Sequence, residues 1–155
     1  MRHMRRVWLV VACASFALAL QVEAQISVFP RQNLSFGTLT PGVAEWVSPT
    51  DATRRAEVEL VGSGNFTVLV EVPTVLKSAS AGDMPVTFAA GDGVLKWAKS
   101  NRSTSFTPGQ AVDVRIPPGI GGAYVWIGGA AQPSSNQRPG DYAGVITVRI
   151  MTAGT

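Results

Sequence analysis

Apolar and polar residues alternate over most of this sequence, and no stretch of about twelve residues has the apolar spacing of an amphipathic helix. Successive side chains of a β-strand point to opposite faces, so this alternation is typical of strands with one buried face. In the run RAEVELVG, for example, Ala56, Val58 and Leu60 share one face. We expect about seven such strands, at residues 33–39, 55–61, 65–72, 84–89, 111–116, 123–128 and 142–150, with a weaker one at 94–98.

Turns rich in glycine and proline separate these runs. The triplet Gly62-Ser63-Gly64 lies between the two strongest runs and predicts a hairpin, and Pro139-Gly140-Asp141 predicts a turn before the last one. The run GAYVWIGG is apolar on both faces and predicts a fully buried strand. Short strands with regular turns favour a single, all-β, antiparallel sandwich domain without repeats or a linker.

The first 24 residues have the order of a secretory signal peptide: the basic start MRHMRR, an apolar run at 7–20, and small residues at Val22 and Ala24. A transmembrane helix needs about 20 apolar residues, so this run is short for one. The segment Val10–Cys13 loosely resembles a lipobox, which leaves a lipoprotein as an alternative. We expect residues 1–24 to be a signal peptide and residues 25–155 to form the sandwich domain. The protein would then be exported to the periplasm, the cell surface or the medium, with no membrane span after cleavage.

Cleavage after Ala24 would remove His3 and Cys13, the only histidine and the only cysteine. The remaining 131 residues could form no disulfide, no Ser-His-Asp triad and no zinc site with His or Cys ligands. They would carry ten basic and nine acidic side chains. This nearly balanced charge does not indicate nucleic-acid binding, for which Lys and Arg would have to cluster on one face. We therefore predict no enzymatic activity, no cofactor, no metal and no nucleic-acid partner.

Three weaker possibilities come from individual side chains. Glu57 and Glu59 could form the carboxylate pair of a glycosidase, although a solvated strand face explains them as well. Asp83 and Asp92 lie beside loop glycines, but their spacing matches no calcium-binding loop. Three tryptophans follow the predicted signal peptide, and each could stack on a sugar or pack in the core: Trp46, Trp97 and Trp126. Only Trp46 has no pattern of apolar neighbours that explains it.

Short motifs at both ends of the chain carry a family resemblance. The opening LSFGTLTPG and the closing WIGGAAQPSSNQRPGDYAGVITVRI, with VGSGNFTVLVEV between them, resemble a domain-of-unknown-function family of exported bacterial proteins. The resemblance covers residues 26–150, and that family is similar to spore-coat-protein-U-like and chaperone–usher pilin subunits. The matching positions, which we interpret as architectural, are Leu34, Phe36, Gly37, Pro41, Gly128, Gly129, Pro139, Gly140, Tyr142 and Gly144.

The resemblance implies an immunoglobulin-like, pilin-like sandwich that lacks one strand. It also implies a structural or adhesive surface subunit, pilin-like or coat-like, assembled by donor-strand addition with neighbouring subunits and a periplasmic chaperone as partners. The missing strand would leave a groove beside the last strand. Its candidate strand-acceptor residues are Tyr142, Ile146, Val148 and Ile150.

Two alternatives remain open. Gln25–Phe29 could fold back and fill the groove within the same chain, although we expect a strand from outside because Pro30 limits what that segment can pair with. The protein could also be a self-contained secreted binding module for a carbohydrate or protein ligand.

Overall fold

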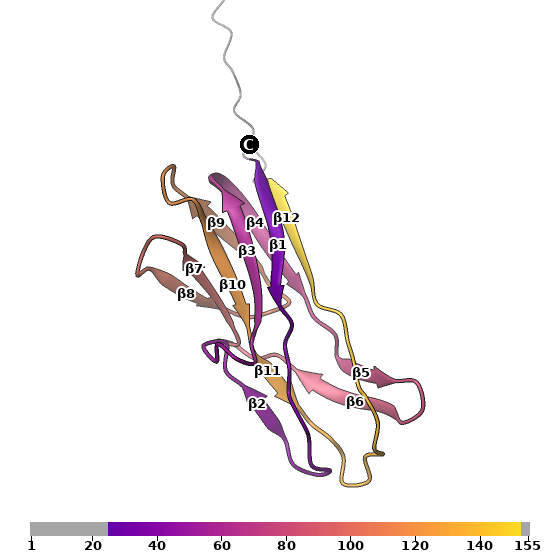
Figure 1. The fold of residues 1–155 in the computed structure, drawn as a ribbon. Helices are drawn as coiled ribbons and strands as arrows, with labels where there is room; N and C mark the ends of the chain where they lie inside the picture. Colours follow the sequence, from indigo (N-terminus) through magenta and orange to yellow (C-terminus); the bar gives the residue numbers. More distant parts are fainter. Residues whose placement is uncertain (1–24, 153–155) are drawn as a thin grey trace, which may run out of the picture.

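The computed structural model describes residues 25–152 as an all-β domain, with no helix in that range (Figure 1). The predicted signal peptide, residues 1–24, lies outside the described residues. The strands are β1 (Ile26–Gln32), β2 (Glu45–Val47), β3 (Ala56–Gly62), β4 (Gly64–Glu71), β5 (Val75–Ser78), β6 (Gly82–Thr87), β7 (Gly93–Trp97), β8 (Ser103–Phe106), β9 (Ala111–Ile116), β10 (Gly122–Ile127), β11 (Gly129–Ala131) and β12 (Thr147–Thr152).

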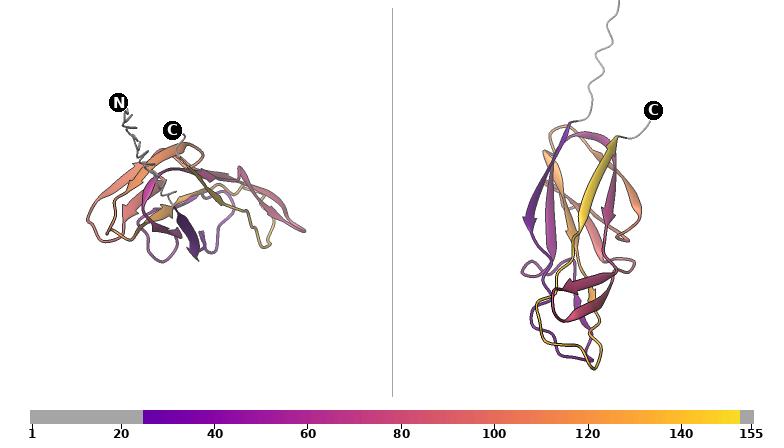
Figure 2. Two further views of the ribbon diagram at one scale, coloured as in Figure 1. Left: turned by 90° about the horizontal axis from the view of Figure 1, so that it is seen from above. Right: turned by 90° about the vertical axis from the view of Figure 1, so that its right-hand side faces the viewer.

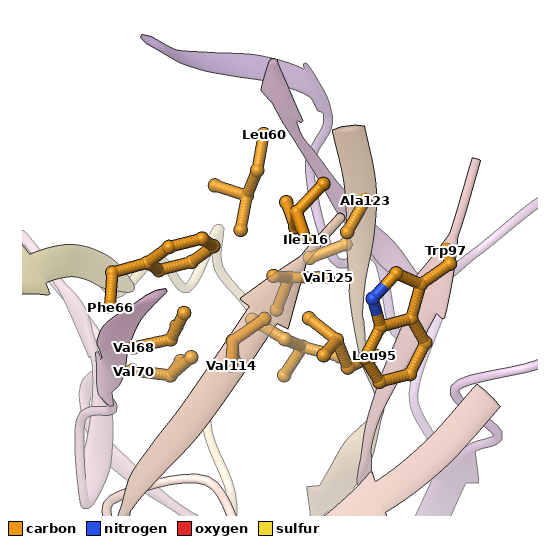
Figure 3. Packing of buried hydrophobic residues seen from close by; sticks show 12 residues of the cluster. Leu60, Phe66, Val68, Val70, Leu95, Trp97, Val114, Ile116, Ala123 and Val125 are labelled. Atoms are coloured by element: carbon orange, nitrogen blue, oxygen red, sulfur yellow. The ribbon is translucent and has the colours of Figure 1, made fainter. Parts of the chain in front are cut away.

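The strands form three antiparallel sheets. A five-stranded sheet with the order β1-β3-β10-β7-β8 faces a three-stranded sheet with the order β12-β4-β9. The main core lies between them and includes Leu60, Phe66, Leu95, Ile116 and Val125 (Figure 3). A four-stranded sheet, β2-β11-β6-β5, extends from one end of these two layers (Figures 1 and 2). The predicted all-β, antiparallel class is confirmed, and the arrangement is consistent with a β-sandwich.

The predicted hairpin at Gly62-Ser63-Gly64 is wrong. β3 pairs with β1 and β10, whereas β4 pairs with β12 and β9, so the triplet carries the chain from one sheet to the other. Gly62 and Gly64 have φ angles of 140° and 128°, which side chains disfavour, and a Cβ on Gly62 would lie 2.3 Å from the Gln25 carbonyl oxygen. The crossing brings the apolar faces of the two strands together at Leu60 and Phe66 (Figure 3).

Two predicted strands at the ends of the domain are misplaced. The first strand is β1, at Ile26–Gln32, whereas residues 33–39 follow it without regular pairing. The last strand begins at Thr147 instead of residue 142. Alternation describes the side chains only, and a strand also needs a partner for its backbone groups. The short strands β2, β5, β8 and β11 were missed because three or four residues carry little alternation.

The prediction of a strand buried on both faces holds for only one face of β10. Ala123, Val125 and Ile127 are fully buried, but Tyr124 and Trp126 are half-buried on the outer face. The Arg55 guanidinium lies 3.7 Å from the centre of the Trp126 ring. A cation over an indole face is a favourable contact, so one side chain covers this ring where a second layer was expected.

Gly128 gives a first stability prediction. A Cβ at this position would lie 2.1 Å from the Val47 carbonyl oxygen and 2.7 Å from the Pro49 nitrogen, both in the backbone beside β2. Gly128→Ala should therefore lower the free energy of unfolding by about 2–3 kcal/mol. Gly37→Ala is the control: no atom lies within 4 Å of its Cβ, and its φ of 69° makes about 1 kcal/mol the expected cost. Equal melting temperatures of the two variants would contradict the packing role of Gly128.

Candidate strand-accepting groove

A long groove runs between two segments of the chain: the second half of β1 with residues 33–41, and residues 137–146 with the start of β12. β1 is the edge of the five-stranded sheet, β12 is the edge of the three-stranded sheet, and each pairs with a neighbour on one side only. The right-hand view of Figure 2 shows β1 (indigo) and β12 (yellow), the edges of the two sheets, on the same side of the domain. The groove has a volume of about 1110 Å³, which is large enough for several side chains.

The lining of the groove is mainly apolar and continuous with the core. Leu34, Val58, Phe88, Ile146 and Val148 line it and also pack against the buried cluster. Each of these five side chains is only half-buried, whereas the residues beneath them are closed off from water. The groove is therefore a place where one wall of the core is incomplete.

β12 presents alternate side chains to the core and to solvent. Val148 pairs with Val70 of β4 and faces inward, while the neighbouring Arg149 points outward and forms an ion pair with Glu71 at 3.0 Å. The predicted division of this run into an apolar and a polar face is thus present within the strand.

The four predicted acceptor residues fall into two groups. Ile146, Val148 and Tyr142 line the groove, whereas Ile150 packs against the core farther along β12. Tyr142 lies in a loop; its hydroxyl is 2.7 Å from Gln137 Nε2 and 2.6 Å from the Arg138 carbonyl oxygen. It holds the 131–140 loop against the end of the domain.

Most of the motif residues border the same groove. The opening motif contributes Leu34, Phe36, Gly37 and Pro41, and the closing motif contributes Pro139, Gly140, Tyr142 and Gly144. Gly128 and Gly129 lie apart from it, where β10 passes into β11.

Sequence reasoning missed the groove residues on β1 and β3. Val28 of β1 and Val58 of β3 line the groove, and both belong to alternating runs, Ile26/Val28 and Ala56/Val58/Leu60. Residues 26–32 pair with β3 and form one wall of the groove; they do not fold back to fill it.

The glutamate pair considered for glycosidase chemistry lies on the outer face of the five-stranded sheet. Glu57 forms an ion pair with Arg55, and Glu59 forms one with Arg31. The Tyr124 hydroxyl also lies 3.4 Å from Glu59. Both carboxylates are held by cations, and their side chains are only 23% and 19% exposed, so ion pairing accounts for them better than solvation does.

Two of the other residues considered as ligands, Asp92 and Trp97, have hydrogen-bond partners of their own. Asp92 is buried and accepts hydrogen bonds from Trp46 Nε1 at 2.9 Å and from the Ala89 amide at 2.7 Å. Trp97 is a buried core residue whose Nε1 donates to the Arg115 carbonyl oxygen. Within residues 25–152, no group of three or more His, Cys, Asp or Glu side chains is arranged to hold a metal ion.

One charge cluster lies in the loop before β3. Hydrogen bonds from Thr53 and Arg54 hold the pKa of the Asp51 carboxyl well below its usual range. Arg54 also forms an ion pair with Glu45 at 2.6 Å and thereby ties this loop to β2. None of these residues lines the groove.

No model of a protein family matches this sequence, and no curated protein matches it significantly. The family resemblance of the two end motifs therefore stays a prediction. In the described part of the chain, no helix is long and apolar enough to cross a membrane.

Proposed function

We propose that this protein is an exported structural or adhesive surface subunit, pilin-like or coat-like, that accepts a β-strand from a partner into the groove between β1 and β12. In this proposal the domain is an immunoglobulin-like sandwich that lacks one strand. The observation that carries it is the apolar groove between two strands that are each unpaired on the facing side.

Two kinds of unsatisfied group in the domain favour the binding of a strand. Unpaired strand edges present backbone N–H and C=O groups that another strand can bind. The groove also leaves half-buried apolar side chains in contact with water, among them Val58 and Val148. An extended segment that satisfies both would bind by β-augmentation.

The lining also indicates the chemistry of that segment. Its charged residues are Arg138 and Asp141, which have opposite signs, and both lie in the loop region before β12. A segment with uncharged, apolar side chains at alternate positions therefore suits the groove along β1 and β12. A neighbouring subunit would supply it in an assembly, and a periplasmic chaperone would cover the groove before that.

Two segments beside the groove support the same proposal. Residues 33–39 and 142–146 carry strand-like sequences but form no regular strands, and both border the groove. An inserted strand would give their backbone groups a partner. We expect both segments to become protected from amide hydrogen exchange when a strand binds.

The test uses a synthetic peptide of about ten alternating Val and Thr residues and a control peptide with Ser in place of each Val. The first should bind the exported protein, and the second should not. Val148→Asp, which places a charge in the groove, should weaken binding by at least about tenfold. Fluorescence anisotropy with labelled peptide measures this difference.

The matched control for this variant is Met151→Asp, on the same strand but exposed on the opposite face and outside the groove lining. It should bind the peptide like the unmodified protein. Val148→Thr is a milder companion, in case the aspartate lowers the melting temperature. Equal binding by Val148→Asp and Met151→Asp would refute the groove as the binding site.

A further inference from the structure

The most exposed aromatic side chain in the described part of the chain is also held in a fixed orientation. Trp46 of β2 is 56% exposed, yet its Nε1 donates a 2.9 Å hydrogen bond to Asp92 Oδ1. Asp92 itself is only 6% exposed, and its second oxygen accepts the Ala89 amide proton. A buried carboxylate thus anchors a large apolar ring that remains open to water.

Small and polar neighbours leave this ring accessible. Trp46 pairs with Ala130 of β11, which pairs in turn with Thr87 of β6, so these three side chains share one row across the sheet. Gln132 follows on the same face of the chain after β11, and its Nε2 lies 3.3 Å from Thr87 Oγ1. Thr87 and Gln132 are both exposed. These side chains form a platform with an indole at one side and a hydroxyl and an amide at the other.

The spacing of this platform matches a sugar ring. Neighbouring strands lie about 4.8 Å apart, so Thr87 is about 10 Å from Trp46 across the sheet. The C–H face of a pyranose can stack on an indole, because that face is apolar while the hydroxyl groups point outward around the ring. Over the small side chain of Ala130, those hydroxyl groups would reach the amide of Gln132 and the hydroxyl of Thr87.

The absence of charged side chains among the four platform residues favours a neutral saccharide over an acidic one. Trp46, Ala130, Thr87 and Gln132 are uncharged, and the nearby Asp92 is buried and already hydrogen-bonded. We propose that this face of the β2-β11-β6 sheet, centred on Trp46, binds a neutral saccharide chain. The site is separate from the groove: none of its four residues lines the groove, so the proposal does not rest on strand acceptance.

The test is nuclear magnetic resonance of the exported protein with cellohexaose, chitohexaose and xylohexaose as probes. The indole N–H signal of Trp46, assigned from its loss in Trp46→Phe, should shift with at least one probe. The signal of the buried Trp97 should stay in place. An acidic oligogalacturonate should bind more weakly than the neutral probes. Trp46→Ala should weaken binding by about tenfold, and Trp46→Phe, which keeps an aromatic face, should weaken it less.

Val43→Ala is the matched control, since Val43 is as exposed as Trp46 and lies three positions before it. It should bind the saccharide unchanged and keep the melting temperature of the parent. Trp46→Ala and Trp46→Phe both remove the hydrogen bond to the buried Asp92 and should lower the melting temperature alike, so a difference in binding between these two variants reports the aromatic face. The proposal is overturned if none of the three neutral probes shifts the Trp46 signal, if Trp46→Ala binds as well as Val43→Ala, or if the alternating Val/Thr peptide shifts that signal and the saccharides do not.

Discussion

A strand linked to the C-terminal end of this chain is expected to raise its free energy of unfolding by about 3–6 kcal/mol. The strand would be a segment of alternating Val and Thr, joined through a short Gly/Ser linker. β12 ends beside the start of β1 (Figure 1), and the groove begins farther along the two strands, at Val148 and Val28. The linked strand would therefore pass between the two free edges to reach the groove, and it would run antiparallel to β12. About four apolar side chains would become buried, each worth about 1.5–3 kcal/mol. The entropy of ordering the added backbone offsets part of that gain.

An increase of this size should raise the melting temperature by about 10–25 °C, because each kcal/mol corresponds to a few degrees in a domain of this length. The control carries the same linker and a segment with Ser in place of each Val, and it should melt like the parent. Size-exclusion chromatography with light scattering, with and without a co-expressed periplasmic chaperone, would report the assembly state. A soluble monomer that melts at the same temperature with and without the apolar strand would rule out the missing-strand proposal.

Phe66→Ala should be the most destabilising single truncation in the core. Phe66 is the largest of the fully buried side chains, and it lies where the chain has just crossed from the five-stranded to the three-stranded sheet (Figure 3). Truncating a buried phenylalanine costs about 3–5 kcal/mol, and a whole domain is stable by only about 5–15 kcal/mol. Urea unfolding should therefore show a much lower midpoint with a similar slope.

Asn65→Ala is the matched control for this truncation. Asn65 precedes Phe66 on β4 and is exposed, so its replacement should change the free energy of unfolding by less than about 0.5 kcal/mol. If Phe66→Ala stayed within about 1 kcal/mol of the parent, the two sheets would not depend on this contact.

The wrong prediction of a hairpin at residues 62–64 shows a limit of local sequence rules. Gly62-Ser63-Gly64 has the composition of a tight turn, and both flanking strands were predicted near their observed bounds. The choice between a hairpin and a crossing depends on what each strand finds to pair with. β3 has β1 and β10 beside it, and β4 has β12 and β9, all of them distant in the sequence from the turn.

The candidate sites show the same limit. Alternation marked Ile146 and Val148 as inward-facing, but nothing in it indicated that Val28 and Phe88 would lie in the same groove. Trp46 was singled out because no apolar pattern explained it, yet its anchor Asp92 is 46 positions away. A contact between residues so far apart depends on how the sheets pack, which no local pattern contains.

The sequence by itself determined the all-β class, because period-two alternation suits a strand with one buried face and excludes an amphipathic helix. It also determined which side chains of β3, β4, β9 and β12 face inward, since that follows from the same period. Only the tertiary structure decided which strands pair, that β1 and β12 each keep a free edge, and that a groove separates them. The physical reason is that strand pairing satisfies backbone groups common to every residue, so the choice of partner is made by the packing of the whole core.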